Sequence, residues 1–159
     1  MTTSRSPSRS PSIEAAALLS LLLVSAGAAA QSISNSSSLS FGAFAAGNGG
    51  TITVSTLGAR SQSGGVVLAS SGSSASAAQI IVSGTASASV AFTLPANGTV
   101  VLSDGSHTMA LNNFVSNPSG SGILGGGTLM LAIGASLSVS PSQVPGNYTG
   151  SFDVTVDYN

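Results

Sequence analysis

The stretch that decides the fold is Gly146–Asn159, with the sequence GNYTGSFDVTVDYN. From Tyr148 to Tyr158 the even positions hold Tyr, Gly, Phe and Val, whereas the odd positions hold Thr, Ser and Asp. A period of two places alternate side chains on opposite faces of a β-strand. This stretch therefore predicts a strand with one buried face and one solvated face.

Similar short runs of alternating residues recur through the rest of the chain, separated by Gly, Ser, Asn and Pro. No segment of useful length has the 3.6-residue period of an amphipathic helix. Short strands at regular spacing favour an all-β fold, and specifically an antiparallel β-sandwich. The predicted strands begin at residues 39–41 and continue over residues 51–55, 65–69, 79–83, 89–94, 99–102, 108–115, 128–133, 137–140 and 147–158.

The composition is unusually poor in charge. Charged residues make up 4% of the chain, against about 25% in an average globular protein. A net charge of -1 supplies no field that would attract phosphate groups, so we expect no nucleic-acid partner. The hydrophobic fraction of 42% is sufficient for a packed core. Cysteine is absent, so burial and backbone pairing must provide the stability without disulfides.

The N-terminal residues have the layout of an export signal. Arg5 and Arg9 precede the apolar block AAALLSLLLV at residues 15–24, and small residues follow up to Ala30. This order predicts a signal peptide over residues 1–30, with cleavage before Gln31. A membrane anchor is the competing interpretation, but residues 15–30 are shorter than the roughly 20 residues that a span needs. We therefore expect an exported protein with no membrane span in the mature chain.

Residues that could carry catalysis are scarce. The single histidine, His107, lies close to Asp104 in what the sequence predicts to be a hairpin turn, whereas members of a catalytic triad usually converge from distant segments. We expect Asp153 and Asp157 to be solvated charges on the polar face of the last strand. Potential metal ligands are too few for a site. The sequence thus predicts a non-enzymatic protein without catalytic residues, metal or cofactor. The role of Arg60 stays open between an exposed charge, an ion-pair partner and a residue that orients a loop.

Motifs spread along the chain resemble a bacterial exported family, the domain of unknown function 4402, which is fimbria-like. They are Leu39-Ser40-Phe41-Gly42, Gly50-Thr51-Ile52-Thr53-Val54, Asn113-Phe114, Asn117-Pro118, Ile133-Gly134 and Gly146-Asn147-Tyr148-Thr149-Gly150. The Gly fourteen residues from the end of Gly146–Asn159 and its penultimate Tyr also resemble the C-terminal motif of chaperone–usher pilus subunits. That resemblance implies an immunoglobulin-like, pilin-like sandwich that lacks one strand, which a periplasmic chaperone and then a neighbouring subunit supply.

The resemblance implies a structural subunit of a bacterial surface fibre or fimbrium, formed by donor-strand complementation, with a role in cell adhesion. Its implied partners are a periplasmic chaperone, an usher and other copies or related subunits. The alternative is a monomeric, self-complete exported surface domain that binds a ligand. On this basis residues 31–38 are a short N-terminal extension or partial donor strand, and residues 39–159 form the sandwich domain.

Two sets of residues carry the expected strand exchange. The candidate donor residues are Ile33, Leu39 and Phe41. The residues expected to bind the partner strand are Gly146, Tyr148, Gly150, Phe152, Val154, Val156 and Tyr158.

Overall fold

The structure is a computed structural model that describes residues 31–158, so the predicted signal peptide lies outside the described residues. The described residues form strands β1 to β14 and no helix. Within this range there is accordingly no helix with the length and apolarity needed to cross a bilayer. The strands are β1 (Ser32–Ser37), β2 (Ser40–Phe41), β3 (Phe44–Ala45), β4 (Gly50–Val54), β5 (Arg60–Gly64), β6 (Val67–Leu68), β7 (Ala75–Ser76), β8 (Ala78–Ser83), β9 (Ser89–Thr93), β10 (Val100–Ser103), β11 (Thr108–Asn117), β12 (Ser121–Ile123), β13 (Thr128–Val139) and β14 (Thr155–Tyr158).

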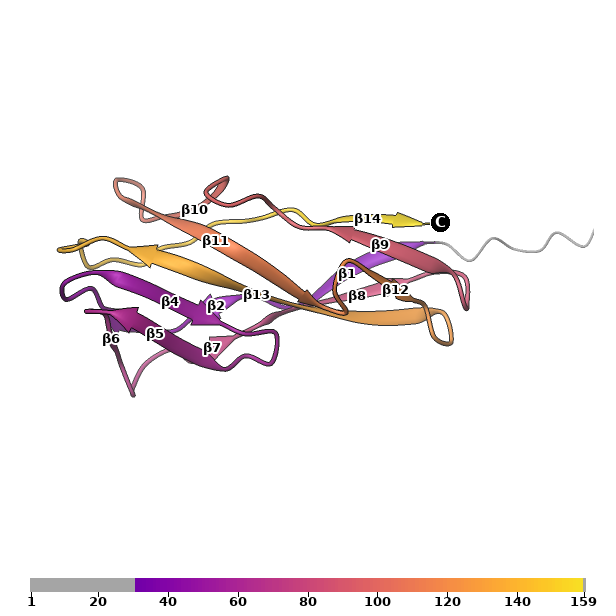
Figure 1. Ribbon diagram of the computed structural model, residues 1–159, viewed down its shortest axis with the longest axis horizontal. Coiled ribbons are helices and arrows are strands. Elements are labelled where there is room, and N and C mark those ends of the chain that lie inside the picture. Colours follow the sequence, from indigo (N-terminus) through magenta and orange to yellow (C-terminus); the bar gives the residue numbers. More distant parts are fainter. Residues whose placement is uncertain (1–30, 159) are drawn as a thin grey trace, which may run out of the picture.

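The strands form an antiparallel β-sandwich, which confirms the predicted fold class. The main sheet has the order β1-β8-β13-β11-β10, and β4 also pairs with β13 and carries β5 on its other edge. A three-stranded sheet, β12-β9-β14, lies across from it (Figure 1). Two short pairs, β2 with β7 and β3 with β6, extend the fold at one end. The start of β1 and the end of β14 both lie at the opposite end (Figure 1).

Strand β13 organises the main sheet. Its first half pairs with β8, its middle with β11 and its last part with β4. Most of its residues from Leu131 to Leu137 are buried, because a central strand has neighbours on both edges. The sequence analysis predicted two strands here, over residues 128–133 and 137–140. Small residues at Gly134, Ala135 and Ser136 hid the continuity of one long strand.

The core is divided into two clusters of buried side chains. One is built around Ile52, Val54, Leu111 and Leu137, and the other around Val82, Val90, Leu131 and Ile133. Three partly buried residues, Leu39, Phe114 and Phe152, pack against both clusters. The rings of Phe114 and Phe152 lie 5.2 Å apart between centroids, within the favourable range for an aromatic pair. These two rings join the main sheet to the C-terminal segment.

The C-terminal strand is shorter than predicted. Only Thr155–Tyr158 pairs as a strand, with β9, whereas residues 150–154 lie outside any ladder. The alternation is nevertheless present: Phe152, Val154, Val156 and Tyr158 are partly buried, and the residues between them are exposed. The predicted faces are therefore correct, and the predicted length of the ladder is wrong.

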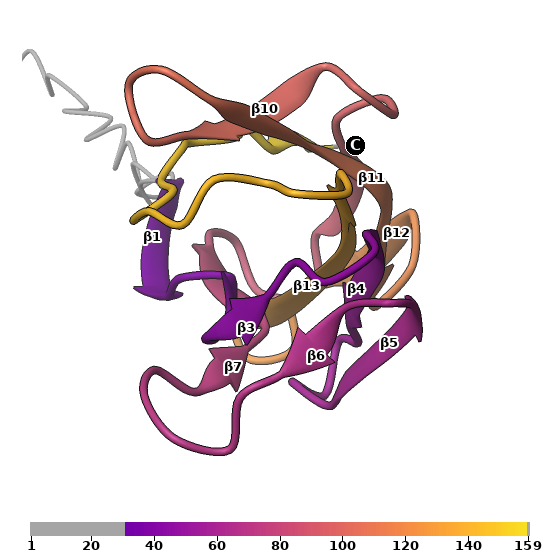
Figure 2. The same cartoon turned by 90° about the vertical axis from the view of Figure 1, so that its left-hand side faces the viewer.

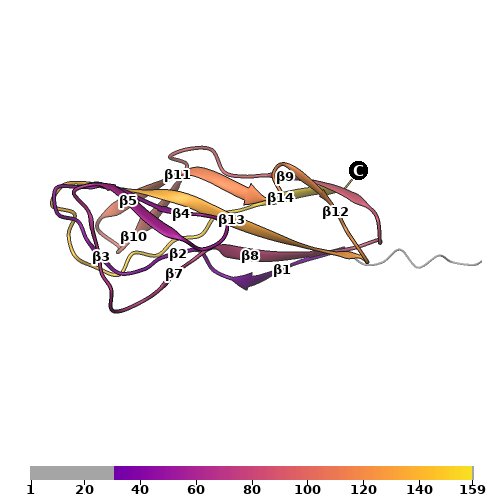
Figure 3. The same ribbon diagram turned by 60° about the horizontal axis from the view of Figure 1, so that its bottom comes forward.

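The N-terminal residues Ser32–Ser37 form an edge strand of the main sheet. This strand, β1, pairs with β8 and lies along the outside of the molecule (Figure 3). Ile33 is in register with the buried Val82, so both side chains are on the same face of the sheet. Ile33 is nevertheless 51% exposed. The core face of β1 is thus left without a covering layer.

Candidate functional site

The most prominent surface feature is a cavity of about 1140 Å³ between two segments that are far apart in the sequence. We call residues 38–46 the N-terminal rim and residues 143–152 the C-terminal rim; both line the cavity along their whole length. Figure 2 shows the two rims opposite each other. Protein interiors have few voids larger than a water molecule, which occupies about 30 Å³ in the liquid. A space of this size is therefore a groove and not a packing defect.

The floor of the groove is apolar. It is formed by residues of β8, β10, β11 and β13, namely Ala78, Ile80, Val100, Leu102, Met109, Leu111 and Leu137. Leu39, Phe41 and Phe44 contribute the N-terminal wall, and Tyr148 and Phe152 the C-terminal wall. None of the residues that line the groove has a charged side chain. The groove therefore suits an uncharged, apolar occupant.

Both sides of the groove have backbone edges that no strand covers. Among the described residues, β1 pairs only with β8, and β14 pairs only with β9. The backbone of residues 150–154 adds a stretch without ladder partners. Unpaired N–H and C=O groups at such edges are a template for a further strand. The groove thus combines an apolar floor with backbone groups available for pairing.

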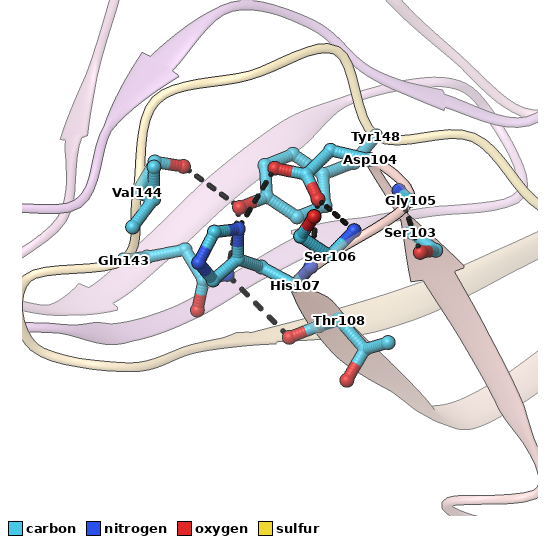
Figure 4. Close-up of polar contacts among 9 residues, drawn as sticks. All are labelled: Ser103, Asp104, Gly105, Ser106, His107, Thr108, Gln143, Val144 and Tyr148. Atoms are coloured by element: carbon cyan, nitrogen blue, oxygen red, sulfur yellow. Dashed lines mark hydrogen bonds and ion pairs between the residues drawn. The ribbon is translucent and has the colours of Figure 1, made fainter.

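The C-terminal rim is fixed by polar contacts at its first half (Figure 4). The Tyr148 hydroxyl donates to the carbonyl oxygen of Val144 at 2.7 Å and accepts from Nε2 of Gln143 at 2.9 Å. Two backbone hydrogen bonds, of 2.8 Å and 3.0 Å, join Ser103 and Thr149. At the other end, the Tyr158 hydroxyl donates to the carbonyl oxygen of Ser83 at 3.2 Å. This last contact joins β14 to β8, that is, one sheet to the other.

The turn that contains Asp104 and His107 lies against the C-terminal rim (Figure 4). The Asp104 carboxylate accepts from the backbone N–H groups of His107, at 2.7 Å, and Ser106, at 2.9 Å. These two backbone hydrogen bonds, in that order, lower the pKa of Asp104 to about 2. The His107 ring lies 3.1 Å from the same carboxylate. The contacts are those of a hairpin turn closed on itself, as the sequence predicts.

Arg60 holds the N-terminal rim, which the sequence left open among three roles. Its guanidinium donates to the carbonyl oxygens of Phe41 and Ala43, both at 3.0 Å, and of Ala69 at 2.8 Å. Gly42, between two of these acceptors, has a φ of +68°, and a Cβ there would lie 2.6 Å from the guanidinium. Only glycine meets both requirements easily. Arg60 therefore orients a loop.

The structure gathers part of the expected site at the groove. Gly146, Tyr148, Gly150 and Phe152 line it, whereas Val154, Val156 and Tyr158 continue beyond it and pack against the second core cluster. The candidate donor residues separate. Phe41 is 6% exposed in the core of its own chain, Leu39 packs against both core clusters, and Ile33 alone stays on the surface.

The sequence analysis missed the floor of the groove and the clamp formed by Arg60. The floor residues looked like ordinary strand interiors, because strand alternation does not show whether a second layer covers them. Arg60 carried a weak signal. It is the sole basic residue after residue 30, and a lone cation in an apolar chain needs several acceptors.

The comparisons with known proteins gave one match. The searches of curated proteins and of solved structures each found no match. The family model described as "Domain of unknown function (DUF4402)" matches residues 32–158. This range contains both rims and the floor of the groove. The chain belongs to the DUF4402 family.

Proposed function

We propose that this protein is a non-enzymatic structural subunit of a bacterial surface fibre or fimbria-like assembly. In this proposal its sandwich is completed when another chain adds a strand in the groove between the two rims. The observation that carries the proposal is the joint presence of an uncharged, apolar groove and unpaired backbone edges on both of its sides.

The energetics favour an occupant. The apolar side chains of the C-terminal segment, Tyr148, Phe152, Val154, Val156 and Tyr158, are all partly buried and none is fully buried. Full burial of such a side chain contributes about 1.5–3 kcal/mol, so covering the remaining surface of all five contributes several kcal/mol. Net stabilities of domains are about 5–15 kcal/mol. Filling the groove is therefore a large effect for a domain of this size.

The geometry suits an extended segment. Each rim runs for about ten residues, and an extended chain rises about 3.3 Å per residue. A strand laid along the groove pairs its backbone with an open edge and places every second side chain on the apolar floor. This is the mode of peptide recognition in which a strand is added to a sheet. A periplasmic chaperone would supply the strand during export, and an usher would direct its exchange.

A fusion tests the proposal. We would attach a ten-residue strand of alternating Val and Thr after Tyr158 through a short flexible linker, and compare it with a fusion in which the same residues form one Val block and one Thr block. We expect the alternating fusion to be monomeric with a Tm raised by about 5–10 °C, because an intramolecular strand fills the groove. The block fusion should behave as the unfused chain does.

The competing function is a self-complete exported domain that binds a small ligand. The cavity supports it to the extent that ligand pockets usually enclose about 300–1,000 Å³. In that case the unfused chain is a stable monomer, and both fusions leave its Tm unchanged. That result would contradict the strand-acceptor proposal.

A further inference from the structure

We infer that the groove is a one-way acceptor. It takes an extended segment from a different protein, uncharged and with a large apolar residue at every second position, and not the N-terminal segment of a second copy of this chain. The inference rests on the proposed function and names the chemistry of the partner.

The lining of the groove defines what the occupant must present. Its floor offers aliphatic surface from four strands, and no charged side chain lines it. A charged residue pointing inward would be desolvated without a counter-charge, which is costly. An inward-facing Ser or Asn would replace apolar contacts with polar groups that the aliphatic floor cannot pair. The occupant therefore needs several aliphatic or aromatic residues with a period of two.

The N-terminal segment of this chain does not meet that requirement. Residues 31–38 read QSISNSSS, with Ile33 as their one large apolar residue. The next two, Leu39 and Phe41, already pack in the core of their own chain, and both line the groove themselves. Donating them to another copy would remove one wall of the donor's own groove.

The N-terminal segment is also already paired. In β1 the register with β8 runs from Ser32 opposite Ser83 to Ser37 opposite Gln79. Withdrawing β1 as a donor would expose this edge of β8, including the backbone beside the buried Val82. A second copy would thus exchange an existing ladder for a new one while inserting a single isoleucine. The balance disfavours exchange between copies of this chain.

The apolar block at residues 15–24 fits the groove poorly as well. Its sequence, AAALLSLLLV, is apolar at consecutive positions, so a strand made from it would present Leu on both faces. One face would fill the groove and the other would remain in water. A segment with strict alternation has no such cost, which leaves a different polypeptide as the partner.

Three peptides test the inference on the chain expressed from its complete sequence, with its N-terminus after expression determined by intact mass. The first is ten residues of alternating Val and Thr with a Lys at each end. The second copies residues 31–41. The third has the composition of the first, with Val and Thr in separate blocks. We expect the alternating peptide alone to bind, raising Tm by about 5–10 °C at a hundredfold excess over its Kd.

The outcomes separate the two claims. If the alternating peptide and the copy of residues 31–41 bind equally well, or if the copy binds better, the groove accepts a strand but the one-way inference is wrong. If no peptide binds, the proposed function itself fails. Binding of the block peptide as tightly as the alternating one would mean that the groove does not read a period of two.

A variant provides an independent check. Ile33→Ser removes the single large apolar residue of the N-terminal segment at an exposed position, so the fold should be retained. We expect unchanged self-association by light scattering and unchanged binding of the alternating peptide. A loss of self-association in Ile33→Ser would show that copies of this chain do exchange their N-terminal strands, and would overturn the inference.

Discussion

Gly150 shows how a single residue shapes the C-terminal rim. A Cβ at this position would lie 2.5 Å from the carbonyl oxygen of Val101 and 3.1 Å from the side chain of Leu102. The rim therefore passes β10 at a distance that only glycine permits. Gly125 differs, because a Cβ there meets no atom within 4 Å.

We predict that Gly150→Ala lowers the free energy of unfolding by about 1–3 kcal/mol, because the rim or β10 must shift. Gly125→Ala, as the matched control, should change it by under about 0.5 kcal/mol. Urea denaturation of both variants measures the difference. Equal effects of the two substitutions would mean that the rim does not approach β10 closely.

Asp104 makes stability depend on pH. Its pKa is lowered from 3.8 to about 2 by the backbone N–H groups of His107 and Ser106. A carboxylate with a lowered pKa in the folded state contributes stability that is fully present above its unfolded pKa and lost as the pH falls toward its folded pKa. We predict a loss of stability between about pH 4 and pH 2. Asp104→Asn should reduce that slope, measured by denaturation at each pH; an unchanged slope would contradict the assignment.

At the scale of the element, Arg60 ties β5 to the N-terminal rim through three carbonyl groups. We predict that Arg60→Met costs about 1–3 kcal/mol of unfolding free energy, because the carbonyls lose a charged donor. Arg60→Lys should lie between Met and wild type, since an ammonium cannot span the three acceptors in the same way. Ser61→Ala, an exposed position on the same strand, serves as the control. An Arg60→Met variant as stable as Ser61→Ala would exclude the clamp.

The face assignment of the C-terminal segment is tested by two reciprocal, nearly isosteric changes. Val154 is partly buried, and Thr155 is exposed. We predict that Val154→Thr, which places a hydroxyl on the apolar side, costs about 1 kcal/mol. Thr155→Val should stay within about 0.5 kcal/mol. Both residues are β-branched, so strand propensity is matched. If the two variants melt alike, the predicted faces are wrong.

Most of the strands could be predicted from the sequence, and those that were missed share a physical reason. Strands β4, β8, β9, β10 and β11 overlap predicted runs, because their buried residues alternate or cluster between turn residues. Strand β5 has the sequence RSQSG and β12 has SGI. Both lie at sheet edges, where side chains need not be apolar. Their pairing depends on the neighbouring strand, which a local pattern does not contain.

The C-terminal segment illustrates the opposite error. Its alternation correctly identified the apolar side from Phe152 to Tyr158, but a ladder also requires a partner along its whole length. Residues 150–154 border the groove and have no neighbouring strand among the described residues. Periodicity reports which face is buried and cannot report how many residues are paired.

At the scale of the whole molecule, the sandwich is held together at its ends and open in its middle. Tyr158 joins the two sheets at one end through Ser83, and Tyr148 fixes the C-terminal rim toward the other. Between them lies the groove of about 1140 Å³. The sequence indicated that an apolar side needed cover. Only the arrangement of both sheets showed that a groove lies beside that side.

The most direct test of the central claim is residue-resolved amide hydrogen exchange with and without the alternating Val/Thr peptide. We predict that exchange slows at least about tenfold for amides in residues 150–156, because a bound strand gives them hydrogen-bond partners. Amides in β11 and β13, already paired, should be affected much less. Unchanged exchange in residues 150–156 at saturating peptide, in a chain that is folded and monomeric, would contradict strand addition in the groove.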